Sequence, residues 1–193
     1  MDESAVETAK ARAREYVRTR GTDAPAAAIR ASVREACESL TALLRGAPVD
    51  RVAQRPGAGE WSVQEIVDHL VETYRPGLDE LRCLLARQAP PGAPIPASLT
   101  SKAPLLRPWP WLLRQLDDLH ADVLEALDGA PDDLGTDARA PVVMVFNAKG
   151  DDGVTPVEWV EALDWKAYAI VSWRLHAIDH LKQARAALAA LRR

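Results

Sequence analysis

The sequence predicts an all-α protein: a four-helix bundle with an extra N-terminal helix and a long connection before the last helix. Two observations carry this prediction. Apolar residues recur at helical spacing over nearly the whole chain, and non-helical segments divide it into four substantial helical stretches and one shorter one. A chain of 193 residues fits a single domain. In it, residues 1–22 would form the added helix and residues 23–193 the bundle.

The N-terminal part predicts two helices in succession. Residues 3–19 carry apolar side chains at helical spacing, and Gly21 is expected to end this helix. Asp23 is placed to cap a second helix, which has Pro25 near its first turn and is expected to end at about Arg45.

The strongest helix start in the chain lies at residues 61–66. Ser62 is placed as the N-cap and Glu65 as the third helical residue, which is the spacing of a capping box. Trp61 and Ile66 then occupy the two positions of a hydrophobic staple. Both motifs indicate the same boundary, so a helix is expected to begin directly after Ser62.

This helix is expected to reach about Gln88, with a kink or break at Pro76–Gly77, because proline removes a backbone donor and clashes one turn back. The proline-rich residues 89–110 predict a long loop, and long loops in compact domains are usually functional or mobile. A third bundle helix is expected from about Trp111 to Leu127.

An irregular connection is expected from Ala130 to Val157. Within it, the apolar run Val142–Phe146, the sequence GDDG and the residues from Val154 onward are consistent with a β-hairpin. The last helix is expected from about Trp165 to Leu191, with Arg192–Arg193 at its negative end.

Composition narrows the class of protein. The balance of 24 basic and 28 acidic residues gives a net charge of −4, which argues against a protein that coats nucleic acid. No apolar run approaches the ~20 residues of a membrane span, and the charged N-terminus lacks the apolar core of a signal peptide. Cys37 and Cys83 form no CxxC motif and are expected to be free thiols in helices. We therefore expect a cytoplasmic protein.

The histidines carry the functional signal. His176 and His180 are four residues apart on the last helix, so both imidazoles share one face, and His69 lies on the inner face of the capped helix. Neutral imidazole is the commonest metal ligand, and three histidines leave an open position for water or substrate. The sequence predicts a three-histidine divalent metal site, although a single helical histidine is more often a hydrogen-bonded or surface residue. His120 is interpreted as such a surface or boundary residue.

Two segments carry a resemblance to a known family. The sequences EWSVQEIVDHL (60–70) and RLHAIDHLKQ (174–183) resemble the two hallmarks of the DinB-like (YfiT-like) family of metal-binding four-helix bundles, the second being H-x-x-x-H-x-x-Q. The resemblance covers about residues 26–191. It implies that His69, His176 and His180 are metal ligands and that Trp61 is the family's helix-start tryptophan. The N-terminal helix, Pro76–Gly77 and the connection over residues 130–157 depart from the family pattern, which leaves the substrate open.

The resemblance also implies a function. Family members are implicated as metal-dependent hydrolases or as transferases that use a low-molecular-weight thiol, and a metal ion can activate either water or a thiol. Zinc or nickel is the favoured ion, with iron, manganese or copper as alternatives. The expected partner is a small molecule, such as a thiol, and the expected assembly is a homodimer. A non-catalytic binding or interaction module is the alternative to an enzyme.

No catalytic residue is assigned from the sequence. Four carboxylates lie near the three histidines and could act as a general base: Glu65, Asp68, Glu72 and Asp179. The competing interpretation is that all four are charges on solvated helix faces, and Glu65 already serves the capping box.

Overall fold

The computed structural model describes residues 3–150 and 153–191, and this part of the chain is mostly helical with one two-stranded sheet. The expected turn residues Asp151–Asp152 and the expected pair Arg192–Arg193 lie outside the described residues. The main elements are α1 (Glu3–Val17), α2 (Ala26–Arg45), α3 (Val63–Leu85), α4 (Trp109–Asp128), β1 (Ala140–Gly150), β2 (Gly153–Leu163), α5 (Trp165–Ala169) and α6 (His176–Ala190). Short π-helical segments follow α1 (η1, Arg18–Thr22) and join α5 to α6 (η3, Ile170–Leu175), and a 3₁₀ turn (η2, Pro104–Leu106) precedes α4.

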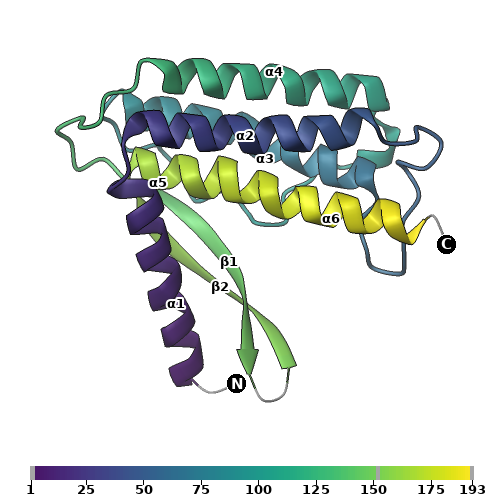
Figure 1. Ribbon diagram of the computed structural model, residues 1–193, viewed down its shortest axis with the longest axis horizontal. Coiled ribbons are helices and arrows are strands. Elements are labelled where there is room, and N and C mark those ends of the chain that lie inside the picture. The colour runs from purple at the N-terminus through teal and green to yellow at the C-terminus, as the bar shows by residue number, and fades with distance from the viewer. Residues whose placement is uncertain (1–2, 151–152, 192–193) are drawn as a thin grey trace.

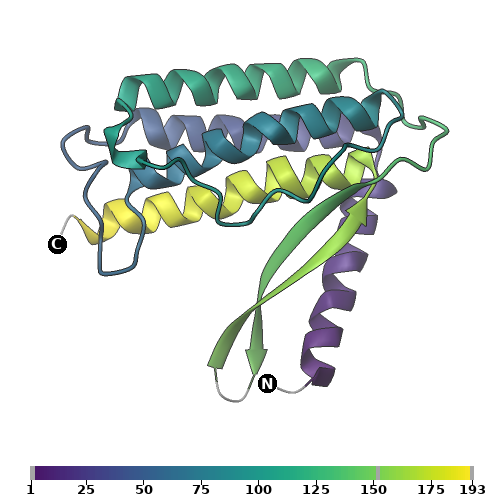
Figure 2. The same ribbon diagram turned by 180° about the vertical axis from the view of Figure 1, so that it is seen from behind.

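Four helical segments lie alongside one another and form what we call the helical body: α2, α3, α4 and the continuous segment from α5 to α6 (Figures 1 and 2). The core lies between them, and α3 contributes most to it because nearly every residue from Val63 to Tyr74 is buried. Burial of this apolar face, rather than helix propensity, supplies most of the stability of such helices. None of the described helices is both long and apolar enough to cross a membrane.

The β-hairpin and α1 project together from one end of the helical body (Figure 1). The strands pair antiparallel, with Met144 opposite Trp159 and Val142 opposite Glu161. Arg14 of α1 donates to Glu161 of β2 over 2.7 Å, which joins the two elements. The hairpin expected from the sequence is confirmed, but it extends over 11 residues in each strand. The described part of the chain is therefore mostly helical, with one small two-stranded sheet in the connection before the last helix.

The start of α3 is as the sequence predicts. Ser62 accepts a hydrogen bond from the backbone of Glu65, and the Glu65 carboxylate accepts one from the backbone of Ser62, so the capping box is complete. Arg55 also pairs with the Glu65 carboxylate. This double anchoring fixes the rotation of the helix, and thus the direction of the side chains that follow.

Of the predicted kink or break at Pro76–Gly77, the break is wrong, because α3 continues through both residues. A proline inside a helix costs about 3 kcal/mol. Here, however, Tyr74, Leu78 and Leu81 are buried on either side of it, and their packing holds the helix together.

The predicted cap of α2 is also wrong. Pro25 occupies the N-cap position and provides no side-chain cap, while Asp23 forms an ion pair with Arg18. The backbone N–H of Ala26 donates instead to Asp132, which lies 106 residues further along the chain. A long-range contact therefore replaces the local cap.

Candidate metal centre and its pocket

The imidazole rings of three histidines from two helices converge inside the helical body. His69 comes from α3, whereas His176 and His180 come from consecutive turns of α6. Their ring centroids are 5.0 Å apart for His69 and His176, 4.7 Å for His69 and His180, and 4.6 Å for His176 and His180. One ring nitrogen from each residue lies within 4.8 Å of the other two. These three residues form the group that we call the triad.

Hydrogen bonds fix which ring nitrogen faces the centre. His69 Nδ1 lies 2.7 Å from the carbonyl oxygen of Leu99, and His180 Nδ1 lies 2.8 Å from Oε1 of Gln183. The His176 ring hydrogen-bonds to the main chain of Ser172. A neutral imidazole carries one N–H, so a ring that donates through Nδ1 presents a lone pair at Nε2.

This arrangement fits a bound cation. The Nε2 atoms of His69 and His176 are only 2.9 Å apart. With the proton of His69 held at Nδ1 by the Leu99 carbonyl, its Nε2 is an acceptor that faces another ring nitrogen. A divalent ion shared by the rings satisfies these lone pairs, and an outer hydrogen bond on each imidazole is the usual feature of histidine ligands.

Burial favours the uncharged form of the triad histidines. Burial is the largest cause of the lowered pKa at each of the three residues. The pKa of His69 is lowered, that of His180 is lowered to about 4, and that of His176 is lowered well below its usual value. The neighbouring rings lower the pKa values of His176 and His180 further. Neutral imidazole is the form that binds metal.

Local structure explains why the three rings meet. Trp61 precedes the capped start of α3, and its ring lies 5.1 Å from His69 and stacks on His180 at 6.4 Å with an interplanar angle of 12°. The Trp61 ring therefore covers one side of the triad. The loop that supplies the Leu99 carbonyl is anchored beside His69, because Asp68 accepts hydrogen bonds from both the backbone and the hydroxyl of Ser101.

The π-helical segment η3 aligns one wall of the site. Tyr168, Ser172, His176 and His180 are spaced four residues apart, and all line the same pocket. An α-helix advances about 100° per residue, so each four-residue step drifts by about 40° around the axis. The wider turns of η3 advance less per residue and offset this drift.

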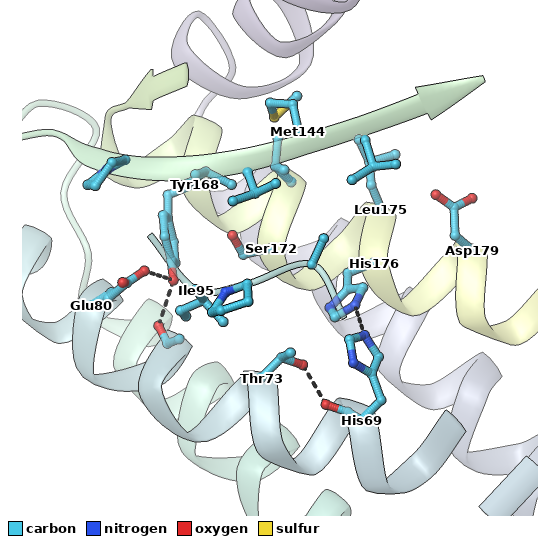
Figure 3. A pocket seen from close by; sticks show the side chains of 18 of the residues that line it. His69, Thr73, Glu80, Ile95, Met144, Tyr168, Ser172, Leu175, His176 and Asp179 are labelled. Carbon is cyan, nitrogen blue, oxygen red and sulfur yellow. Dashed lines mark hydrogen bonds between the residues drawn. The ribbon is translucent and has the colours of Figure 1, made fainter. Parts of the chain in front are cut away.

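A pocket with a volume of about 690 Å³ adjoins the triad. Figure 3 shows His69 and His176 at one end and the Tyr168–Glu80 pair at the other. The walls between them are mainly apolar and come from the loop before α4 (Ile95, Pro96 and Ala97), from the base of the hairpin (Pro141–Val145) and from the segment joining α5 to α6 (Val171 and Leu175). The triad therefore has space beside it for a small molecule.

Comparison with known families agrees with this geometry. The sequence model of the DinB superfamily matches residues 32–184, which include all three histidines. The chain belongs to the DinB superfamily. No curated protein and no solved structure matches it. The match leaves α1 and η1 outside, so this DinB-superfamily chain carries its N-terminal helix as an addition to the matched region.

Three of the four carboxylates considered as bases in this DinB-superfamily protein have structural partners. Glu65 completes the capping box, Asp68 holds Ser101 and lies 3.1 Å from Arg107, and Glu72 lies 2.7 Å from the same arginine. Asp179 lines the pocket but is largely exposed and lies 3.4 Å from Lys182. Glu80, which the sequence reasoning missed, also lines the pocket. Its position, eleven residues or about three turns after His69, was the available signal.

The sequence pattern predicts His120 at the surface or boundary of the protein. This prediction is wrong, because His120 is buried. Its Nδ1 lies 3.2 Å from the Thr41 hydroxyl, and its ring packs 5.8 Å from that of Tyr74. It is not part of the triad. Cys37 is a buried free thiol whose pKa is raised to about 12 by burial, so it behaves as an apolar core residue, while Cys83 is free and partly exposed.

Proposed function

We propose that this protein is a metal-dependent enzyme in which His69, His176 and His180 bind one divalent cation and the adjoining pocket binds a small-molecule substrate. The reaction class is hydrolysis, with water as the nucleophile, or transfer to a low-molecular-weight thiol. One observation carries the proposal: the facing Nε2 atoms of His69 and His176, 2.9 Å apart, open onto a pocket of about 690 Å³.

The chemistry follows from the donor set. A divalent ion held by three imidazoles would keep one coordination position open. A water or thiol bound at that position would have a lowered pKa and so would lose its proton more easily. Zinc or nickel suits such a set best, and iron, manganese or copper are the alternatives. The protein's own contribution is to hold the three rings by their outer hydrogen bonds and to enclose the substrate between apolar walls.

The second candidate is a non-catalytic binding module. It is favoured by the structural partners of Glu65, Asp68 and Glu72, because these leave Asp179 as the only one of the four considered carboxylates that lines the pocket. An ion with a coordination position that substrate can occupy would favour the enzyme. An ion whose coordination positions are all filled by the protein would favour the binding module.

The first experiment measures metal content. Wild-type protein is incubated with Zn²⁺ or Ni²⁺, dialysed and analysed for metal, beside the variant His176→Ala/His180→Ala. We expect about one ion per wild-type chain and none in the double variant. His120→Gln is the matched control, because it removes a buried histidine outside the triad and should keep the ion. A wild-type chain that retains no divalent ion would end the proposal.

We further propose that the helical body is the four-helix bundle of DinB-like proteins and that the chain forms a homodimer. The side-by-side packing of α2, α3, α4 and the α5–α6 segment supports the first point. The exposed apolar side chains of Leu105 and Leu106 support the second. Light scattering should give twice the chain mass of 21.1 kDa, and a mass equal to one chain would contradict the dimer.

A further inference from the structure

The end of the pocket remote from the triad carries a second polar group. The hydroxyl of Tyr168 lies 2.6 Å from Oε2 of Glu80 and 3.2 Å from the carbonyl oxygen of Gly77 (Figure 3). Tyr168 is fully buried, so this contact holds the Glu80 carboxylate in a fixed direction.

Among the side chains that the structure describes, those of residues 6–145 and 157–191, no arginine, lysine or histidine forms an ion pair with Glu80, and its carboxylate accepts a hydrogen bond from Tyr168. Burial raises the pKa of Glu80, and the hydrogen bond from Tyr168 opposes this rise. The other carboxylate of the pocket, Asp179, differs because it is largely exposed and faces Lys182.

A half-buried carboxylate in an apolar wall is costly unless a cation or a hydrogen-bond donor meets it. The Tyr168 hydroxyl has a single O–H and can donate only one hydrogen bond. Other acceptor sites on the Glu80 carboxylate therefore stay open. Apart from the histidines of the triad, the described residues that line the pocket include no basic side chain, and Ser172, which hydrogen-bonds to Tyr168, carries no charge. A ligand group with positive charge would satisfy Glu80 within the pocket.

The two polar ends also set a length. Glu80 follows His69 by eleven residues of α3, which is about 16 Å along the helix axis, and Tyr168 precedes His176 by eight residues on the facing segment. The wall between the ends is mainly apolar, with the hydroxyl groups of Thr73 and Ser172 as its polar side chains. The complementary ligand is therefore elongated, apolar in its middle and cationic at one end.

We propose that the pocket binds an elongated primary amine, with its ammonium group on the Glu80–Tyr168 pair and its other end at the triad. The placement of the second end rests on the proposed metal site, whereas recognition of the ammonium group does not. Glu80 and Tyr168 are then specificity-determining residues rather than catalytic ones.

The test uses octylammonium as the probe, with 1-octanol and octanoate as its uncharged and anionic counterparts, in calorimetric titrations of the full-length chain. The metal-free wild type should bind octylammonium roughly tenfold or more tightly than either counterpart. Octanol or octanoate binding as tightly as the amine, or no saturable binding of the amine, would overturn the proposal. This comparison needs no variant, so it stands even if a substitution impairs folding.

The variant Glu80→Gln keeps the acceptor for the Tyr168 hydroxyl and removes the charge. It should weaken octylammonium binding roughly tenfold and leave 1-octanol binding unchanged, in both the metal-free and the zinc-loaded protein. Asp79→Asn is the matched control, because it removes the neighbouring charge on α3, which is exposed and outside the pocket, and should bind like wild type. Equal amine affinity of wild type and Glu80→Gln in both forms would overturn the proposal. Failure of the metal site would appear separately, as absent zinc.

Discussion

Gln183 holds His180 in the orientation that the triad needs. Its Oε1 accepts from His180 Nδ1 over 2.8 Å, so the proton stays on the outer nitrogen and Nε2 faces the centre. Gln183 is the last residue of the sequence pattern H-x-x-x-H-x-x-Q, and this contact gives its presence a physical reason. One turn of α6 thus supplies both the third triad histidine and the group that orients it.

Replacing Gln183 with leucine should therefore weaken zinc binding by about tenfold, the lower end of the range for an outer hydrogen bond, because Gln183 is exposed to solvent. Gln183→Glu should bind zinc like wild type, since a carboxylate accepts the same hydrogen bond. Competition with a chromophoric chelator measures both affinities. Equal affinity of wild type and Gln183→Leu would show that the contact does not orient the ring.

His120 makes the stability of the protein depend on pH. Burial lowers its pKa from 6.5 to about 4, with Asp117 opposing the shift. Well above pH 6.5 the residue is neutral in both the folded and the unfolded chain, so it adds no pH dependence there. Between pH 6.5 and 4 the unfolded chain takes up a proton that the folded chain does not. The free energy of unfolding therefore falls as the pH falls through this range.

The variant His120→Gln should lose this contribution, which amounts to at most about 3 kcal/mol between pH 6.5 and 4. Urea unfolding of the metal-free wild type and of the variant at several pH values measures the difference, and subtraction cancels the titration of the triad. Parallel pH profiles for the two proteins would contradict the prediction.

At the scale of elements, the junction between η1 and α5 depends on Gly21. A Cβ at this position would lie 2.7 Å from Cα and 3.1 Å from the backbone nitrogen of Ala167. Beside it, the Thr22 hydroxyl donates to the Asp164 carboxylate, which caps α5 through the backbone of Ala167. The added N-terminal helix is thus joined to the helical body through a backbone contact that only glycine allows.

Gly21→Ala should destabilise the protein by about 1–3 kcal/mol, because the backbone of Ala167 cannot move aside as a flexible side chain could. Gly129→Ala is the control. A Cβ at position 129 meets no atom within 4 Å, and its φ of −100° suits any residue, so its effect should stay within about 1 kcal/mol. Equilibrium urea unfolding measures both, and equal stability of the two variants would refute the role of Gly21.

The elements that the sequence predicted well are those defined by local patterns. The start of α3 follows from the four-residue capping box at Ser62, and α4 from the apolar stripe that includes Leu112 and Leu116. Predictions failed where contacts with residues distant in the sequence determine how a helix starts or continues. The cap of α2 comes from Asp132, and α3 continues through Pro76 because both neighbouring turns are buried. Local rules do not contain such contacts.

At the scale of the whole molecule, the same distinction applies to the site. The spacing of His176 and His180 places them on one face of one helix, and the structure places His69 opposite them, as the sequence predicted. The Glu80–Tyr168 pair joins residues 88 positions apart, and part of the pocket wall comes from the hairpin. Neither follows from spacing within one helix, because each depends on how α3, the hairpin and the last helix pack.

A metal ion at the triad would couple the folding of the whole molecule to metal concentration. His69 and His176 are 107 residues apart in sequence and meet only in the folded chain, so an ion bound by both stabilises the folded state alone. At a free Zn²⁺ concentration of about 1,000 times Kd, the free energy of unfolding should rise by about 4 kcal/mol. Urea unfolding with and without Zn²⁺ measures this rise. His69→Ala should lose it and His120→Gln should keep it. An equal rise in His69→Ala would place the binding elsewhere, and no rise in wild type would contradict the site.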